Sequence, residues 1–146
     1  MKTVECGFSG PSAANRLTGD GPNILVDIGF DPAWRPGKIP TPKDRDIVVL
    51  IDTGAQECFI DCDLANHLQL PIVDRREVAG SMGKHEVDGY LAQLHISALD
   101  LTHYGQFAGA YLNRGGLQYS VLMGRTFLES FMLMYDGRSG RVTLTG

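Results

Sequence analysis

The sequence has no apolar run near the ~20 residues that a membrane-spanning helix needs. Its first residues, MKTVECGFSGPSAANRL, contain no continuous apolar segment of the kind found in a signal peptide. It has no Lys/Arg-rich stretch, and with a net charge of -4 we expect no nucleic-acid partner. Its three cysteines, Cys6, Cys58 and Cys62, cannot all pair within one chain, which favours reduced thiols. Together these absences predict a cytoplasmic protein with no membrane segment in this chain.

Glycine and proline, by contrast, are abundant. Eighteen glycines and seven prolines indicate many turns, which is typical of a fold of short strands rather than a helical bundle. The 146 residues, 43% of them apolar, suffice for one domain with a hydrophobic core. Residues 1–20 are small, polar and aperiodic. We therefore predict a flexible N-terminal arm or an early irregular strand over residues 1–20, and one folded domain over residues 21–146.

The pattern of apolar residues predicts strands along most of this domain. Residues 47–51 (IVVLI) form a continuous apolar run, typical of a strand buried on both faces. Residues 90–98 alternate between apolar and polar, as a half-buried strand does. Further strands are predicted over residues 23–30, 58–60, 107–112, 120–123, 131–135 and 142–144.

Helices and turns connect these strands. One main short helix is predicted over residues 62–70, with Asp61 as its N-cap and Pro71 ending it. Residues 126–130 have the length of one or two helical turns. Residues 78–94 predict a β-hairpin, because two strand-like pieces flank the glycine-rich residues 80–84. The proline-rich residues 31–46 predict a surface loop.

The strongest chemical signal is a strand of the buried type that stops at Asp52 and continues as Thr53-Gly54-Ala55. A carboxylate at the end of such a strand is costly unless it is hydrogen-bonded, paired or functional. Gly54 allows a tight turn close to the carboxylate, and the Thr53 hydroxyl can brace the loop. The pattern predicts a carboxyl group held at the floor of a cleft; a structural aspartate that caps a turn is the alternative.

On these residues the sequence resembles the retropepsin family of aspartic proteases. Asp52-Thr53-Gly54-Ala55 is similar to the family's catalytic loop, and residues 121–125 (VLMGR) resemble its second landmark, an apolar run ending in Gly-Arg before a short helix. A glycine-containing hairpin lies between them, where the family carries its flap. The resemblance covers residues 47–144. It implies an all-β, closed β-barrel with one main short helix, a flap hairpin and psi-loops.

The resemblance also implies a role for each matching residue. Asp52 would be the catalytic carboxylate, with Thr53 and Gly54 as active-site support. Gly124 and Arg125 would support the site structurally. Neither a metal nor a cofactor is implied. The substrate would contact Ala55 and the flap residues Gly80, Ser81, Met82 and Gly83.

The family's chemistry needs two aspartates that face each other, and this chain supplies one. No second Asp-Thr-Gly or Asp-Ser-Gly occurs. Two adjacent carboxyls share one proton, so the ionised one can act as a base on water while the protonated one donates to the scissile carbonyl. A homodimer in which Asp52 meets its own copy is the simplest arrangement. The predicted activity is therefore hydrolysis of peptide bonds in extended polypeptides by a homodimeric endopeptidase.

Two features depart from the viral members of the family. Gln56 and Glu57 follow Ala55 where those members carry acidic residues, so either Glu57 or Gln56 is a candidate partner for Arg125. The C-terminal segment has the pattern of a hairpin of its own, so the terminal-strand dimer sheet of the viral enzymes is not assumed.

Other functions are compatible with the same residues. A dimeric adaptor that binds extended peptides without cutting them would have the same fold, and an enzyme limited to self-processing would carry the same motif. Cys58, Cys62 and His67 offer only three ligands at a loose spacing, which disfavours a metal site.

Overall fold

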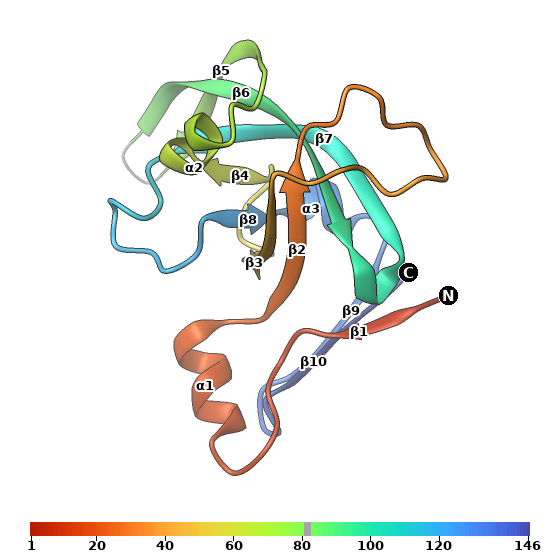
Figure 1. The fold of residues 1–146 in the computed structure, drawn as a ribbon. Helices are drawn as coiled ribbons and strands as arrows, with labels where there is room; N and C mark the ends of the chain where they lie inside the picture. Colours follow the sequence, from red (N-terminus) through yellow and green to blue (C-terminus); the bar gives the residue numbers. More distant parts are fainter. Residues whose placement is uncertain (81–82) are drawn as a thin grey trace.

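The computed structural model describes residues 1–80 and 83–146, and six of its strands close into a β-barrel (Figure 1). Neighbouring strands pair in the order β2-β3-β8-β4-β7-β6, and β6 pairs back onto β2. Strand β5 extends the sheet beyond β6, with which it forms the β5–β6 hairpin. The bounds are β2 (Asn23–Gly29), β3 (Asp44–Ile51), β4 (Phe59–Asp61), β5 (Ile72–Gly80), β6 (Gly83–Ile96), β7 (Leu101–Ala110) and β8 (Val121–Met123).

A smaller antiparallel sheet lies beside the barrel, in the lower part of Figure 1. Its order is β1 (Thr3–Glu5), β10 (Arg141–Thr145) and β9 (Met132–Asp136), so the two ends of the chain pair with each other and β9 forms an edge. The helices are α1 (Ala13–Asp20), α2 (Cys62–His67), α3 (Arg125–Leu128) and the 3-10 turn η1 (Ser97–Leu99). None of the helices in the described residues has the length and apolar character required to span a membrane.

Strand β8 lies between β3 and β4, and this placement brings the two sequence landmarks together. Strands β3 and β8 are parallel, with Ile51 opposite Met123, while β4 and β8 are antiparallel. Because parallel strands end at the same edge of a sheet, the loop after β3 and the turn after β8 become neighbours. The connection from β3 to β4, with β8 paired between these two strands, is the predicted psi-loop.

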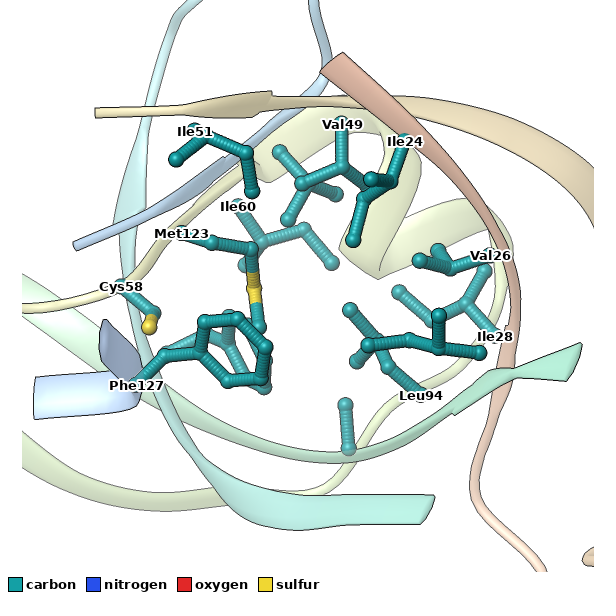
Figure 2. Packing of buried hydrophobic residues seen from close by; sticks show 14 of the residues in the cluster. Ile24, Val26, Ile28, Val49, Ile51, Cys58, Ile60, Leu94, Met123 and Phe127 are labelled. Carbon is teal, nitrogen blue, oxygen red and sulfur yellow. The ribbon is translucent and has the colours of Figure 1, made fainter. Parts of the chain in front are cut away.

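The barrel interior is filled by aliphatic side chains from most of its strands (Figure 2). On β3, Val49 and Ile51 point into this core, whereas Leu50 faces the other way and joins a second, smaller cluster. The predicted burial on both faces holds only in part: Val49 and Ile51 are buried and Leu50 is half-buried, whereas Val48 is 40% exposed.

The strands predicted at residues 23–30 and 47–51 are confirmed as β2 and β3, and the hairpin around residues 80–83 is confirmed in its two strands. Helix α2 begins after Asp61 as predicted, because the Asp61 carboxylate accepts a hydrogen bond from the Leu64 N–H at 3.2 Å.

Residues 1–20, predicted as a flexible arm or an early irregular strand, contain the strand β1 and also the helix α1, which was not predicted. Three residues of this segment pair with β10 as β1, and eight more form α1. The segment packs closely against Gly140, because a Cβ at Gly140 would lie only 2.5 Å from the Ala13 carbonyl oxygen. A short edge strand and a helix with Asn, Thr and Gly in its eight residues leave no clear periodic signal in the sequence.

Candidate active site

Asp52 is the first residue beyond β3, and backbone bonds hold it in place. Its own N–H donates to the Met123 carbonyl at 3.0 Å, which continues the β3–β8 pairing by one step. The Gly54 N–H then donates to Asp52 Oδ1 at 2.9 Å. A Cβ on Gly54 would lie 3.1 Å from that oxygen, so glycine allows this close approach. Among the residues described, the Asp52 carboxylate forms no ion pair, and it is half-buried while Thr53 and Gly54 are exposed.

The Gly124-Arg125 turn holds the loop that follows Asp52, which we call the Asp52 loop (residues 52–57). A Cβ on Gly124 would lie 2.8 Å from the Ala55 carbonyl oxygen and closer still to that of Glu57, so only glycine fits without a shift. The Arg125 N–H donates to Ala55 O at 2.8 Å. The Arg125 guanidinium donates to the Thr53 carbonyl at 2.7 Å.

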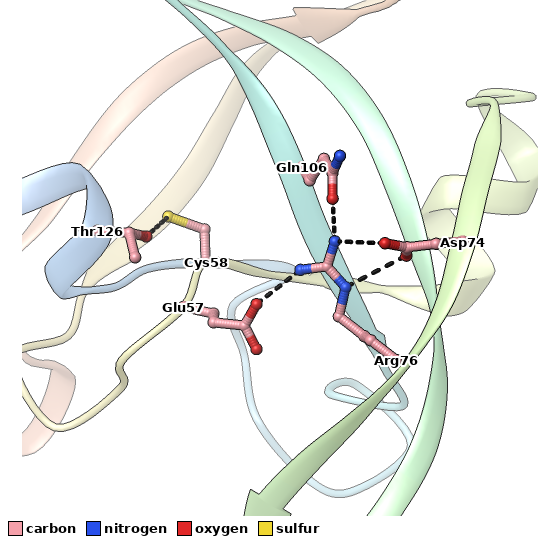
Figure 3. Close-up of polar contacts among 6 residues, drawn as sticks. All are labelled: Glu57, Cys58, Asp74, Arg76, Gln106 and Thr126. Atoms are coloured by element: carbon pink, nitrogen blue, oxygen red, sulfur yellow. Dashed lines mark hydrogen bonds and ion pairs between the residues drawn. The ribbon is translucent and has the colours of Figure 1, made fainter.

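The side chains proposed from sequence as partners of Arg125 therefore lie elsewhere. Gln56 contributes its backbone carbonyl, which accepts from the Thr126 N–H at 3.0 Å. The Glu57 carboxylate is bound by Arg76 of β5, whose Nη1 donates to it at 2.6 Å (Figure 3). Arg76 gave no signal in the sequence, since an arginine on a strand of a polar hairpin is typical of a solvated face.

Arg76 also binds two further side chains in Figure 3. Its Nε and Nη2 donate to the two oxygens of Asp74 at 3.3 and 3.2 Å, and Nη2 donates to Gln106 of β7 as well. The hydrogen bond to Asp74, followed by that to Glu57, raises the pKa of Arg76. The guanidinium thus remains charged and joins β5, β7 and the Asp52 loop.

Two of the predicted flap residues, Gly80 and Gly83, lie at the end of the β5–β6 hairpin. Gly80 and Gly83 are paired in the register of the two strands, and Gly83 has a φ of 99°, a conformation that favours glycine. Ser81 and Met82 lie outside the described residues. Ala55 is half-buried within the Asp52 loop.

An apolar wall lies on the same face of β3 as Asp52, because Leu50 is two residues before it on the strand. Leu50 packs with Phe59 of β4 and Leu122 of β8. Next to Phe59, a cavity of about 490 Å³ opens between the β5–β6 hairpin and the end of β7. Phe59 lines this cavity whereas Leu122 is buried, and the sequence pattern of Phe59 is that of an ordinary core residue, so sequence alone could not assign it to the cavity.

The cysteines lie in or near the core, and none forms a disulfide. Burial raises the pKa of Cys6 to about 12, and burial also raises the pKa of Cys58. Within residues 1–80 and 83–146, His, Cys, Asp and Glu side chains form no group of three that could hold a metal ion.

Comparison with solved structures defines the class of fold. The chain is similar to EIAV protease complexed with the inhibitor HBY-793, with a TM-score of 0.50 and 17% identity over 75% of this chain and 86% of that one. It is also similar to a retropepsin-like aspartic protease from Rickettsia conorii, with a TM-score of 0.53 and 12% identity over 97% of this chain and 89% of that one.

The chain therefore has the retropepsin-like fold, as the sequence resemblance predicted. No family model matches the sequence, and a search of curated proteins also finds no match.

Proposed function

We propose that this chain is an aspartic endopeptidase whose active site forms when Asp52 meets Asp52 of a second copy. The observation that carries the proposal is the position of Asp52 in a retropepsin-like fold. The carboxylate stands at the end of β3, is held by the Gly54 N–H at 2.9 Å, and rests on a loop fixed by Gly124 and Arg125.

The proposed hydrolysis uses two carboxyl groups that lie on either side of one water molecule. When two such groups lie close together, both cannot ionise at low cost, so the pair holds one proton. The ionised carboxylate takes a proton from the water as it attacks the scissile carbonyl, and the protonated partner donates to the carbonyl oxygen. Each chain brings one Asp-Thr-Gly, so the second carboxyl comes from the second chain.

The apolar wall supports a polypeptide substrate. The partly buried Leu50 and Phe59 pack against the buried Leu122 on the Asp52 side of β3, and the cavity beside Phe59 has room for a large side chain. We expect cleavage next to bulky apolar residues, because burying such a side chain contributes about 1.5–3 kcal/mol.

A peptide library tests the proposal. Asp52→Asn and Asp52→Ala should each abolish cleavage at acidic pH, while peptide binding by Asp52→Asn persists. Asp44→Asn is the matched control, since Asp44 stands on β3 and its carboxylate also accepts a backbone N–H at 2.9 Å. Wild-type protein that binds library peptides and cuts none would instead indicate an adaptor.

A further inference from the structure

The two arginines at the base of the β5–β6 hairpin have different surroundings. Arg75 and Arg76 are neighbours on β5, so their side chains leave opposite faces of the strand. The Arg75 side chain is 60% exposed and pairs with Asp88 and Glu86, both within the hairpin. The Arg76 side chain is only 20% exposed, and two of its partners, Glu57 and Gln106, lie outside the hairpin.

The pairing of β5 with β6 leaves room for the Arg76 cluster. Gly89 lies opposite Asp74 in the strand register. A Cβ at Gly89 would lie 3.1 Å from both Nε and Nη2 of Arg76, and would overlap Asp74 Oδ1. Any side chain at position 89 would therefore displace the Arg76–Asp74 pair. The ion cluster depends on this glycine, unlike the exposed pairs of Arg75.

The Glu57 end of the Arg76 cluster is also held by neighbouring residues. Glu57 closes the Asp52 loop, and its backbone carbonyl lies against Gly124. The next residue, Cys58, is buried directly before β4, and its thiol contacts the Thr126 hydroxyl at 3.8 Å. A guanidinium bound to Glu57 is thus bound to an end of the Asp52 loop that packs against Gly124 and leads directly into β4.

We propose that Arg76 is a positioning residue that fixes the base of the β5–β6 hairpin relative to the Asp52 loop and so sets the shape of the substrate cleft. This inference rests on the proposed endopeptidase function. The planar guanidinium suits the task because it can reach Glu57, Asp74 and Gln106 at once, which a lysine ammonium cannot do in the same geometry.

Steady-state kinetics on a cleaved peptide gives the first test. Arg76→Gln should raise KM about tenfold, with a smaller change in kcat, because the cleft loses its shape while the Asp52 pair remains. Arg76→Lys should give an intermediate KM. Arg141→Gln is the control and should leave both constants unchanged, since Arg141 pairs with Glu5 on the small sheet and does not line the cavity beside Phe59. Adding Glu57→Gln to Arg76→Gln should raise KM no further, since the two residues act as a pair.

Hydrogen–deuterium exchange gives a second test that needs no activity. Arg76→Gln should speed exchange in both β5 and the Asp52 loop, whereas Arg75→Gln should leave the Asp52 loop unchanged. Arg76→Gln that behaves like Arg141→Gln in the kinetic test, or like Arg75→Gln in the exchange test, would overturn the inference. If wild-type protein cuts no peptide but the exchange result holds, Arg76 still links the two segments and only the endopeptidase proposal fails.

Discussion

At the scale of single residues, the site depends on backbone groups rather than on side-chain pairs. Asp52 accepts from the Gly54 N–H, and Arg125 donates to the Thr53 carbonyl. A neutral amide holds this carboxylate, and among the residues described no cation lies within ion-pair distance of it.

Gly124 is the residue at which the loop is least tolerant of change. Gly124→Ala should cost at least about 2 kcal/mol of unfolding free energy, because its methyl group would enter the space of the Ala55 and Glu57 carbonyls. Urea unfolding measures this cost. Gly19→Ala is the matched control, since nothing lies within 4 Å of its Cβ and it stands in α1, where alanine is favourable. Equal stability of the two variants would refute this account of the turn.

His103 makes the fold sensitive to acid. Its ring packs edge-on against Phe107 and Phe127 at centroid distances of 5.9 and 5.3 Å, and burial lowers its pKa from the usual 6.5. The unfolded chain therefore binds a proton first, so stability is lost as the pH falls through 6.5 and below.

We expect the unfolding free energy of His103→Gln to fall less between pH 7 and pH 5 than that of wild type. Urea unfolding at the two pH values gives both differences. The same carboxylates titrate in both proteins, so their contribution to the fall in unfolding free energy cancels in the comparison. An equal fall would mean that His103 is not the source of the acid sensitivity.

At the scale of elements, β9 is an edge strand without the usual protection. Met132 and Met134 are 66% and 49% exposed, and β9 contains no Lys or Pro. Within the described residues, its only strand partner is β10. Edge strands normally carry charge or proline to prevent pairing with other chains. We therefore expect a second copy to cover β9 in the proposed homodimer.

Met132→Lys/Met134→Lys should convert the dimer to monomer, because the introduced charges of the two copies would repel each other and stay solvated. Sedimentation equilibrium measures the change in mass. Ile39→Lys is a suitable control, since Ile39 is also 66% exposed but lies in the loop between β2 and β3. A double variant that dimerises like wild type would place the interface elsewhere.

The sequence predicted those elements whose signal is local. The run at residues 47–51 and the Asp61 N-cap of α2 needed no long-range contact to be recognised. The β1 strand and α1 could not be predicted in the same way, because β1 exists through its pairing with β10 at the other end of the chain. The Arg76 cluster depends likewise on residues brought together by the barrel, from positions 57, 74 and 106.

At the scale of the whole molecule, the proposed site is one half of a pair that a second copy completes. The β3–β8 crossing positions one Asp52, and in Figure 1 the small sheet and α1 extend from the barrel on the side away from the β5–β6 hairpin. The single Asp-Thr-Gly in the chain makes the homodimer necessary for the proposed chemistry.

Mixing two kinds of chain tests this requirement most directly. Wild-type protein is combined with a ninefold excess of Asp52→Asn chain, and a size tag on one kind reports that subunits have exchanged. About one wild-type chain in ten then has a wild-type partner, so peptidase activity per wild-type chain should fall about tenfold. The same excess of Asp44→Asn chain should leave the activity unchanged. Full activity in exchanged mixtures with Asp52→Asn would show that each chain carries a complete site, and would contradict the shared pair of aspartates.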